Sequence, residues 1–161
     1  LCVVMGKRGK YIPLDDALNY IAGYTIINDV SERRLKIRER AQTEEWDRFF
    51  DWLNGKLMDT FAPCGPWITT VDEIPDPQQL RIRLWVNGEL QQDGNTRDMI
   101  FTVADIVHYL SHISTLEPGD LIATGTPLGV GVARGLHLKP GDVVTIEIDK
   151  IGRLENPVMS E

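Results

Sequence analysis

The chain has 161 residues, of which 42% are hydrophobic and 25% are charged, and its formal net charge is −7 at pH 7. A soluble chain of this length and composition is expected to form one globular domain whose core needs no disulfide bond or structural metal. The excess of acidic residues argues against a surface for nucleic acid or for anionic membranes, which needs clustered Lys and Arg.

The first predicted elements are apolar runs separated by turn residues. Residues 1–6 predict a strand. Because this apolar run opens the chain without an initiator Met, we interpret the sequence as a domain whose N-terminal part is missing. Residues 13–23 predict a short helix that Pro13 opens and Gly23 ends. A second strand is predicted over residues 24–28.

Asn28 and Asp29 interrupt the apolar pattern where that second strand ends. Asn and Asp are common in turns, so an ordinary turn is one interpretation. The other is that the strand is a rigid support and that Asp29 is a functional carboxylate mounted on it. One Asp alone does not make a Mg²⁺ site, which needs several oxygen ligands, so both interpretations stay open at this point.

Residues 31–55 are highly charged and are predicted to be helical in part. Within them, "TEEWDRFFDWLNG" predicts a helix that is capped by Thr43 and ended by Asn54-Gly55. The apolar residues of this segment have helical spacing: Trp46, Phe49, Phe50 and Leu53.

The second half of the chain is predicted to be mostly β. Residues 81–86 alternate apolar and polar side chains, and the following Asn87-Gly88 is typical of a type I′ hairpin. One helix is predicted over residues 102–113, where Thr102 and Asp105 have the spacing of a capping box.

Two copies of one turn complete the pattern. The segments "EPGD" and "KPGD" each predict a type II turn, and each is followed by an apolar strand. We therefore predict one domain over residues 1–161, of the α+β class and dominated by short strands.

Two further features favour a cytoplasmic protein. No apolar run reaches the ~20 residues that a membrane span needs, and no signal peptide is visible. Cys2 and Cys64 have neither CxxC nor metal-ligand spacing, so we expect two reduced and mostly buried thiols.

His108 and His112 are four residues apart on a predicted helix, a spacing that lets two imidazoles share a metal ion. The apolar stripe of that helix leaves both histidines on its outer face: Val103, Ile106, Val107, Leu110 and Ile113. Since no third ligand lies nearby in sequence, we interpret them as solvated surface histidines.

The glycine-rich segment "TGTPLGVGVARG" lacks the Gly-Lys-Ser/Thr sequence of a P-loop and the third glycine of a dinucleotide site. Its Gly125-Thr126-Pro127 follows a predicted strand and exposes backbone N–H groups and one hydroxyl, which suits a carboxylate ligand. A plain loop and an anion site are equally compatible with this sequence.

Lys56 follows a glycine and lies among apolar residues. Most lysines are simply solvated. A lysine held close to a divalent cation would be pushed toward its neutral form and could stabilise a charge or exchange a proton. Spacing alone favours the solvated interpretation.

Five segments together resemble, in order, the signature blocks of the fumarylacetoacetate hydrolase family. They extend from the first strand to about Val158 and include "AGYTIINDVSER", "GKLMDTFAPCGPWITT", "DPQQLRIRLWVNGELQQDGNTRDMIF", "LEPGDLIATGTPLGVG" and "LKPGDVVTIEIDKIGRLENPV". The combination is specific for the family and says little about the substrate. The resemblance implies the family's C-terminal domain, a roll of mixed β-strands with a few short helices, usually in a homodimer.

The resemblance also implies a divalent metal ion. Members of the family bind Mg²⁺, and in some cases Mn²⁺ or Ca²⁺, through a Glu-x-Glu pair and an Asp that Asp29 matches. The Glu-x-Glu pair precedes the apolar run that begins here with Leu1. The His and Glu of the family's N-terminal lid precede it as well, so this chain contains none of the four. Thr60 falls beside the lysine position in the hydrolases and is assigned with Asp29 to the metal site.

Further roles are implied position by position. Lys56 matches the lysine of the family's Gly-Lys-Ser-Phe motif, although the Ser is replaced here, and is assigned as the catalytic residue. Arg33 matches an arginine that contacts substrate, and Lys36 replaces a glutamine that holds substrate in several members. Thr126 matches a threonine that binds the substrate carboxylate, and Gly125 beside it is assigned to the same site.

The implied function is a Mg²⁺-dependent enzyme acting on 2-keto acids, acylpyruvates or related dicarboxylates through a metal-stabilised enolate. The reaction would be C–C bond hydrolysis, decarboxylation or double-bond isomerisation. Lys56 would stabilise the developing oxyanion, while Thr126 and Arg33 would orient the acid. Two alternatives are a sugar-acid dehydratase on the same metal scaffold and an inactive remnant that lacks two ligand glutamates.

The predicted helix near residues 43–55 has two interpretations of its own. Helical periodicity favours packing of its apolar stripe on the core. Its position between Asp29 and Lys56, with Asn54-Gly55 as a flexible joint before the lysine, suggests instead a lid that closes over the metal site and excludes water.

Overall fold

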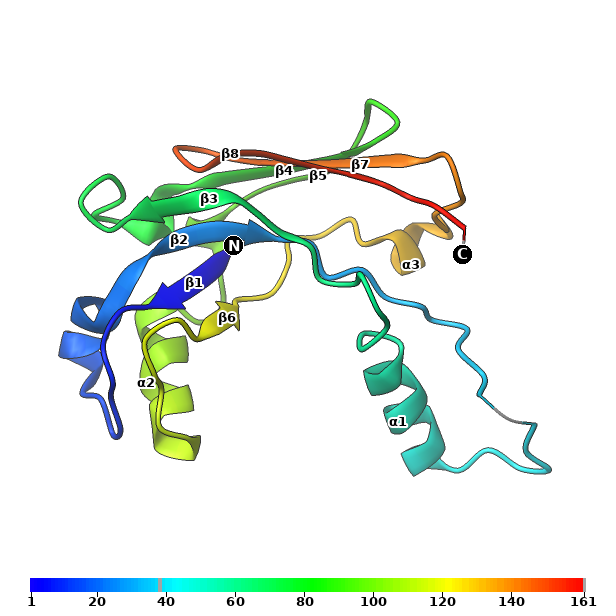
Figure 1. Cartoon of the computed structure of the whole chain (residues 1–161), viewed down its shortest axis with the longest axis horizontal. Coiled ribbons are helices and arrows are strands. Elements are labelled where there is room, and N and C mark those ends of the chain that lie inside the picture. Colours follow the sequence, from blue (N-terminus) through cyan, green and yellow to red (C-terminus); the bar gives the residue numbers. More distant parts are fainter. Residues whose placement is uncertain (38, 161) are drawn as a thin grey trace. The chain divides into compact units, whose positions relative to one another are not determined.

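The computed structural model describes residues 1–37 and 39–160, which form two compact units. The first unit, here called the sheet unit, comprises Leu1–Ile26 and the chain from Gly65 onward. The second, here called the inserted unit, is the continuous stretch Ile27–Cys64, from the last residue of strand β2 (Ile21–Ile27) to the first residue of strand β3 (Cys64–Thr70) (Figure 1). Each unit is described by itself below.

Strands dominate the fold and form two four-stranded sheets. The first has the order β3-β2-β1-β6, with β1 at Cys2–Met5, β2 at Ile21–Ile27, β3 at Cys64–Thr70 and β6 at Leu121–Ala123. The second has the order β5-β4-β7-β8, with β4 at Arg81–Val86, β5 at Glu89–Asn95, β7 at Val143–Ile148 and β8 at Gly152–Pro157. The pairs β1–β2, β1–β6, β4–β5, β4–β7 and β7–β8 are antiparallel. The strand-dominated α+β class is therefore confirmed.

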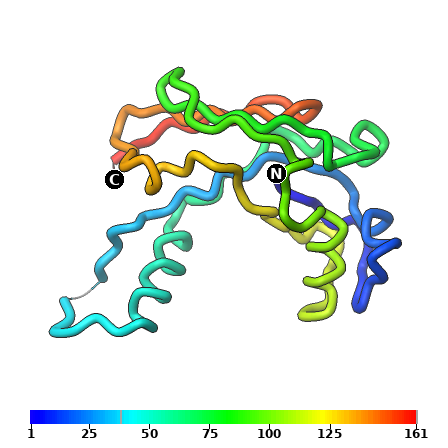
Figure 2. The backbone as a smooth tube through the Cα atoms, turned by 180° about the vertical axis from the view of Figure 1, so that it is seen from behind, coloured from blue at the N-terminus to red at the C-terminus, as the bar shows by residue number. Residues whose placement is uncertain are grey.

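The helices are short. Helix α1 spans Glu45–Asn54, α2 Val103–Ile113 and α3 Gly131–Arg134, and three 3₁₀ helices cover Leu14–Tyr20 (η1), Pro77–Gln79 (η2) and Thr96–Asp98 (η3). Helix α2 packs beside η1 (Figure 1). Figure 2 shows the two ends of the chain from behind, with the N-terminal strand beside β6 and the C-terminal segment near the turn before β7. Among the described residues, no helix combines the length and the apolar character needed to cross a membrane.

The hydrophobic core lies in the sheet unit. Its largest fully buried side chains come from β1, β2 and the segments that pack on them, and they include Met5, Ile12, Tyr24, Ile26 and Ile74. Each Å² of apolar surface removed from water stabilises the fold by about 25 cal/mol, so such a core is the main source of its stability. Packing of these apolar side chains thus stabilises the sheet unit.

Predicted turns and caps of the second half are confirmed. Asn87 and Gly88 both have positive φ, as a type I′ turn requires. The segments "EPGD" and "KPGD" each close with a hydrogen bond from the Asp N–H to the carbonyl three residues earlier, with glycines at φ +92° and +94°. In α2 the Thr102 hydroxyl accepts from the Asp105 N–H at 3.1 Å, while the Thr102 N–H donates to the Asp105 carboxylate at 2.8 Å.

The prediction that Gly23 ends a helix is wrong. Residues 14–20 form a 3₁₀ helix, and Gly23 lies inside β2. A Cβ atom at Gly23 would lie 2.4 Å from the Thr69 carbonyl oxygen of β3. The glycine is therefore required for close approach of two strands, which a helix-end signal in the sequence does not distinguish.

Two smaller predictions are also corrected. Glu44, not Thr43, is the N-cap of α1, and its N–H donates to the Asp47 carboxylate at 3.0 Å. Cys2 is buried as expected, whereas Cys64 is exposed because it begins β3 at the border of the inserted unit.

Candidate functional site

Asp29 and Lys56 come together in the inserted unit, although 27 residues separate them in the chain. The Lys56 ammonium donates to the Asp29 carboxylate, and it also donates to the Ser31 hydroxyl at 3.1 Å. The Lys56 side chain is 20% exposed, whereas that of Asp29 is 58% exposed. The structure therefore brings the predicted metal carboxylate and the predicted catalytic lysine into direct contact.

The end of β2 holds Asp29 in place. Asn28 is buried, and its backbone N–H donates to the Pro63 carbonyl at 3.0 Å. The Val30 N–H donates to the Asn28 carbonyl at 2.8 Å and tightens the turn that follows. The neighbouring residues are thereby fixed, while the Asp29 carboxylate faces outward.

Helix α1 positions Lys56 at its C-terminal end. The Gly55 N–H donates to the Asp51 carbonyl at 3.0 Å, and the Gly55 carbonyl accepts from the Glu32 N–H at 2.8 Å. A Cβ atom at Gly55 would lie 2.1 Å from the Glu32 carbonyl oxygen. Gly55 has helical φ and ψ, and its role as a flexible joint stays a prediction. It is the point where the segment after Asp29 crosses the end of the helix.

Two neighbours of Lys56 were missed by the sequence analysis. Ser31 is a hydrogen-bond partner, and the Lys56 ammonium lies 5.5 Å from the centroid of the Trp52 ring. Trp52 occurs one helical turn before Lys56, and Ser31 occurs two residues after Asp29. Both spacings are visible in the sequence, but neither identifies a contact until the chain crossing at Gly55 is known.

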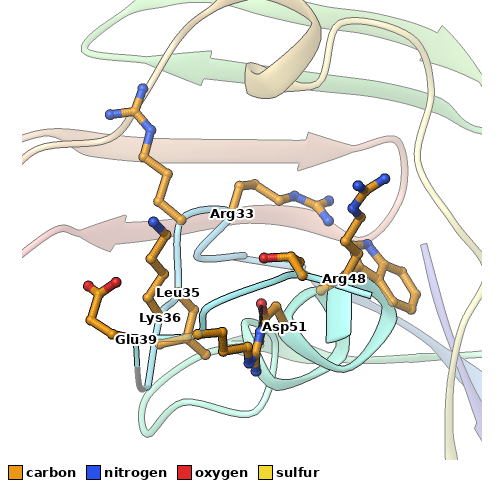
Figure 3. A pocket seen from close by; sticks show the side chains of 10 residues that line it. Arg33, Leu35, Lys36, Glu39, Arg48 and Asp51 are labelled. Carbon is orange, nitrogen blue, oxygen red and sulfur yellow. Dashed lines mark hydrogen bonds and ion pairs between the residues drawn. The ribbon is translucent and has the colours of Figure 1, made fainter. Parts of the chain in front are cut away.

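A cavity of about 500 Å³ lies beside these residues within the inserted unit, and Trp52 contributes to its wall (Figure 3). The labelled side chains in the figure come from the segment before α1 and from α1 itself. Most of the residues that line the cavity are charged, and the basic ones outnumber the acidic ones: Arg33, Arg34, Lys36, Arg40 and Arg48 against Glu39 and Asp51, together with Leu35, Thr43 and Trp52. A cavity with this charge suits an anionic ligand.

One ion-pair cluster organises the wall of this cavity. The Arg40 guanidinium binds both Asp51 carboxylate oxygens, at 2.7 and 2.9 Å, and lies 3.4 Å from the Asp47 carboxylate. The hydrogen bonds from Arg40 hold the pKa of Asp51 below its usual value, and the charge of Lys36 adds to the shift. Asp51 therefore stays ionised and ties the charged segment to α1.

Arg33 and Lys36, predicted to bind substrate, both line this cavity. With Arg40 engaged by Asp51, they remain among the cations available to a ligand. The family resemblance predicted both as substrate-binding residues. In the structure both line the cavity, and they belong to the same unit as Asp29 and Lys56.

Gly125 and Thr126 belong to the sheet unit, in the segment after β6. The Thr126 hydroxyl accepts from the side-chain amide of Gln92 at 3.0 Å, and the same amide donates to the Pro127 carbonyl at 2.8 Å. Gln92 is buried in β5 and was missed by the sequence analysis. Its amide fixes the segment and leaves Thr126 exposed, as an anion-binding position would be.

The glycines of this segment have a packing role. A Cβ atom at Gly129 would lie 2.4 Å from the Gln91 carbonyl oxygen, and one at Gly94 would lie 2.6 Å from the Pro127 side chain. By contrast, a Cβ at Gly125 would meet nothing within 4 Å, and Gly125 has a φ of +99°. Close packing on β5 thus explains Gly129, and the turn conformation explains Gly125.

Thr60 is exposed and has a φ of +64°. A β-branched residue rarely adopts the left-handed conformation, which costs about 1–2 kcal/mol. Such strain is common at functional sites. The strained backbone at Thr60 is consistent with a functional position, and its assignment to the metal site stays a prediction.

The aromatic stripe of α1 does not lie in the core. Trp46, Phe49, Phe50 and Trp52 are between 46% and 71% exposed, and no residue of the helix is buried. The rings pack on one another instead, with Phe49 edge-on to both Trp46 and Phe50. The interpretation as a packed core helix is therefore wrong, and the lid interpretation remains a prediction.

The donor set was tested against a divalent metal ion. Among the described residues, no group of three or more His, Cys, Asp or Glu side chains could hold one. The Asp29 carboxylate is an exposed, hard oxygen donor of the kind that Mg²⁺ and Mn²⁺ accept. It fits such an ion as one ligand, with the remaining positions supplied by water, substrate or other protein residues.

Comparison with known proteins shows the family to which the chain is related. The model of the fumarylacetoacetate (FAA) hydrolase C-terminal domain matches residues 1–159. The mitochondrial oxaloacetate tautomerase of Xenopus laevis is 44% identical over 161 residues, which cover 99% of this chain and 48% of that protein. The chain spans about half the length of the curated relatives it matches.

Solved structures give the same result. Fumarylacetoacetate hydrolase from Exiguobacterium antarcticum has a TM-score of 0.88 at 38% identity, with 99% of this chain and 55% of that chain covered. Fumarylpyruvate hydrolase from Pseudomonas aeruginosa, solved in complex with Mn²⁺ and pyruvate, has a TM-score of 0.84 at 33% identity, with 99% of this chain and 64% of that chain covered.

Proposed function

The chain belongs to the fumarylacetoacetate hydrolase family, and from this premise we propose that the protein is a divalent-metal-dependent enzyme acting on acylpyruvates or related 2-keto acids. The observation that carries the proposal is the contact between Asp29 and Lys56, whose neighbour Trp52 lines a cavity with basic walls. The relative solved with Mn²⁺ and pyruvate supports both the metal and the 2-keto acid. Mg²⁺ is the ion we propose for this protein.

Asp29 would supply one carboxylate oxygen to the metal ion. Its backbone is fixed through Asn28, and its side chain is exposed, so an ion can reach it without rearrangement of the core. When bound, the ion would polarise the carboxylate and keto oxygens of the substrate and lower the energy of the enolate. Thr60 is proposed to lie beside the metal.

Lys56 would stabilise negative charge as it develops on the substrate. Its ammonium is oriented by the Ser31 hydroxyl and the Trp52 ring, so it does not depend on Asp29 alone for its position. A preoriented cation of this kind needs little reorganisation during the reaction, which makes its contribution large.

The acid groups of the substrate need cationic or hydrogen-bonding partners. Arg33 and Lys36 in the cavity are proposed to contact the substrate, and Thr126, with Gly125 beside it, is proposed to bind a substrate carboxylate. Such contacts would orient the acid for reaction. A homodimer and a cytoplasmic location remain part of this proposal.

Tautomerisation is a second candidate reaction, because the relative from Xenopus laevis is named an oxaloacetate tautomerase. Moving a proton between carbon and oxygen of a 2-keto acid needs the same polarised keto group and the same lysine. It does not need a water molecule activated for C–C bond cleavage.

The experiment is a turnover assay of the whole protein against acylpyruvates, oxaloacetate and a hepta-diene dioate, with Mg²⁺, with Mn²⁺ and with a chelator. Metal-dependent loss of acylpyruvate absorbance supports hydrolysis, and faster enol–keto exchange of oxaloacetate without cleavage supports the tautomerase. Equal rates in chelator and in metal would contradict both.

A further inference from the structure

Two histidines of α2 lie against the segment 10–12 in the sheet unit. His108 Nδ1 is 2.7 Å from the Ile12 carbonyl oxygen, and His112 Nδ1 is 2.9 Å from the His108 carbonyl oxygen. The interpretation of both as solvated surface residues is therefore wrong for His108, which is half-buried and bound to the backbone. His112 is exposed.

These contacts fix which nitrogen of each ring carries the proton. A carbonyl oxygen only accepts hydrogen bonds, so each Nδ1 must donate its N–H. In the neutral imidazole the other nitrogen, Nε2, then has an unprotonated lone pair. Metal-binding histidines commonly have this arrangement, with one ring nitrogen on the metal and the other donating to a carbonyl or carboxylate.

The spacing of the two rings fits a shared ion. The ring centroids of His108 and His112 are 4.6 Å apart. With metal–nitrogen bonds of about 2.0–2.1 Å, an ion would lie roughly 3.2 Å from each centroid, and the two rings would subtend about 90° at the ion. That angle is close to those of tetrahedral and octahedral coordination, so the centroid spacing is compatible with one shared ion.

The pair is also held rigidly. The Ser111 hydroxyl accepts from the Ile12 N–H at 2.9 Å and donates to the His108 carbonyl at 2.7 Å, and the Tyr11 N–H donates to the Ser111 carbonyl at 3.1 Å. Ser111 is fully buried. Because the protein has already fixed the helix against this segment, binding would order little else.

A cation, an anion and an aromatic ring lie near the two histidines. The Lys10 ammonium donates to the His112 carbonyl at 3.2 Å, and the Tyr11 ring lies edge-on to His112 at 5.4 Å. On the other side, hydrogen bonds from Thr102 lower the pKa of Asp105, and the charge that His108 can carry lowers it further. Asp105 thus stays anionic one turn before His108.

We propose that His108 and His112 together bind one divalent transition-metal ion through their Nε2 atoms, at a site independent of Asp29. Imidazole nitrogen favours Ni²⁺, Cu²⁺ and Zn²⁺ over Mg²⁺. Since the described residues form no group of three or more ligands, water completes the coordination shell. The site is open and exchangeable, as the exposure of His112 requires.

Titration calorimetry of the whole protein with Ni²⁺ tests this proposal. Because Ni²⁺ also displaces Mg²⁺ from oxygen ligands, the decisive observation is one Ni²⁺-binding event per chain that becomes at least about tenfold weaker in His112→Gln, since even outer-sphere changes cost 10–100-fold at metal sites. His112 is exposed, so this variant keeps its fold, which circular dichroism without metal verifies. His108→Gln should weaken binding as much, but it also removes the bond to Ile12, so His112→Gln carries the test.

Matched controls come from the same chain. His137→Gln removes the third histidine of the sequence, and Cys64→Ser removes the exposed thiol that could compete for the metal. Both should bind Ni²⁺ as the unmodified protein does. Unchanged affinity in His112→Gln, or an equal loss in either control, would overturn the proposal. So would ¹⁵N spectra in which Nε2 of His112 carries the proton in the neutral ring.

Discussion

The two units of the molecule differ in the interactions that stabilise each of them internally. In the sheet unit, apolar side chains from β1, β2, β4, β7 and α2 form one buried cluster. In the described part of the inserted unit, no hydrophobic side chain is buried, and the contacts are mainly hydrogen bonds and ion pairs such as Arg40–Asp51 and Lys56–Asp29. The first unit is a scaffold stabilised by packing, and the second is a polar structure that carries the proposed chemistry.

Strand β2 shows this change within four residues. Ile26 is fully buried, Asn28 is buried with its N–H bonded to the Pro63 carbonyl, and the Asp29 side chain is 58% exposed. A strand anchored in the core thus ends in a carboxylate that faces outward. The packed sheet unit therefore supplies rigidity, and the polar inserted unit carries the residues of the proposed chemistry.

The largest expected effect on stability comes from a substitution in the core of the sheet unit. Ile26→Ala should reduce the free energy of unfolding by about 2–5 kcal/mol, because it removes buried methylene groups and leaves a cavity. Phe49→Ala, on the exposed face of α1, should reduce it by no more than about 1.5 kcal/mol, because the ring contacts with Trp46 and Phe50 are lost but no core cavity forms. Urea denaturation measures both. Equal losses in the two variants would show that α1 is packed as the core is.

Lys56 tests the chemistry of the inserted unit. Lys56→Met should lower kcat about 10²–10³-fold with a smaller effect on KM, because the ammonium acts on charge that appears in the transition state. Lys36→Met, in the cavity wall, is the matched control and should mainly raise KM. Steady-state kinetics separates the two. If Lys56→Met leaves kcat unchanged and raises KM strongly, Lys56 is only a binding residue.

Gly55 tests the chain crossing that positions Lys56. Gly55→Ala should destabilise the protein by about 1–3 kcal/mol, because its methyl group would overlap the Glu32 carbonyl oxygen. Asn54→Ala, one residue earlier, lacks this overlap and should stay within about 0.5 kcal/mol. Thermal unfolding compares them, and equal midpoints would show that the crossing adapts freely.

The smallest expected effect concerns motion of α1. Its backbone amides should exchange faster than those of β1 and β2 in the metal-free whole protein, because no residue of α1 is buried. They should slow when Mg²⁺ and oxalate bind, as a lid would. Slow exchange without ligand, unchanged by it, would exclude the lid and leave α1 as a static element.

The sequence predicted what depends on local chemistry. The hairpin at Asn87-Gly88 and the cap at Thr102 follow from backbone preferences of neighbouring residues, and both are confirmed. The purpose of Gly23 could not be predicted, because it depends on a carbonyl of β3, 46 residues later in the chain.

The candidate site divides in the same way. The family resemblance selected Asp29 and Lys56, and the structure brings them into contact. Ser31, Trp52 and the Arg40–Asp51 pair were not predicted, since each depends on the chain crossing at Gly55 rather than on a local pattern.

The most direct test of the central claim, that Asp29 is a metal ligand on a rigid support, is the metal dependence of turnover in Asp29→Asn of the whole protein. We expect turnover to be abolished at all Mg²⁺ and Mn²⁺ concentrations, while the unfolding midpoint stays within the range of the unmodified protein, because an exposed carboxylate contributes little packing. Near-normal turnover of this variant at modest Mg²⁺ would contradict the account.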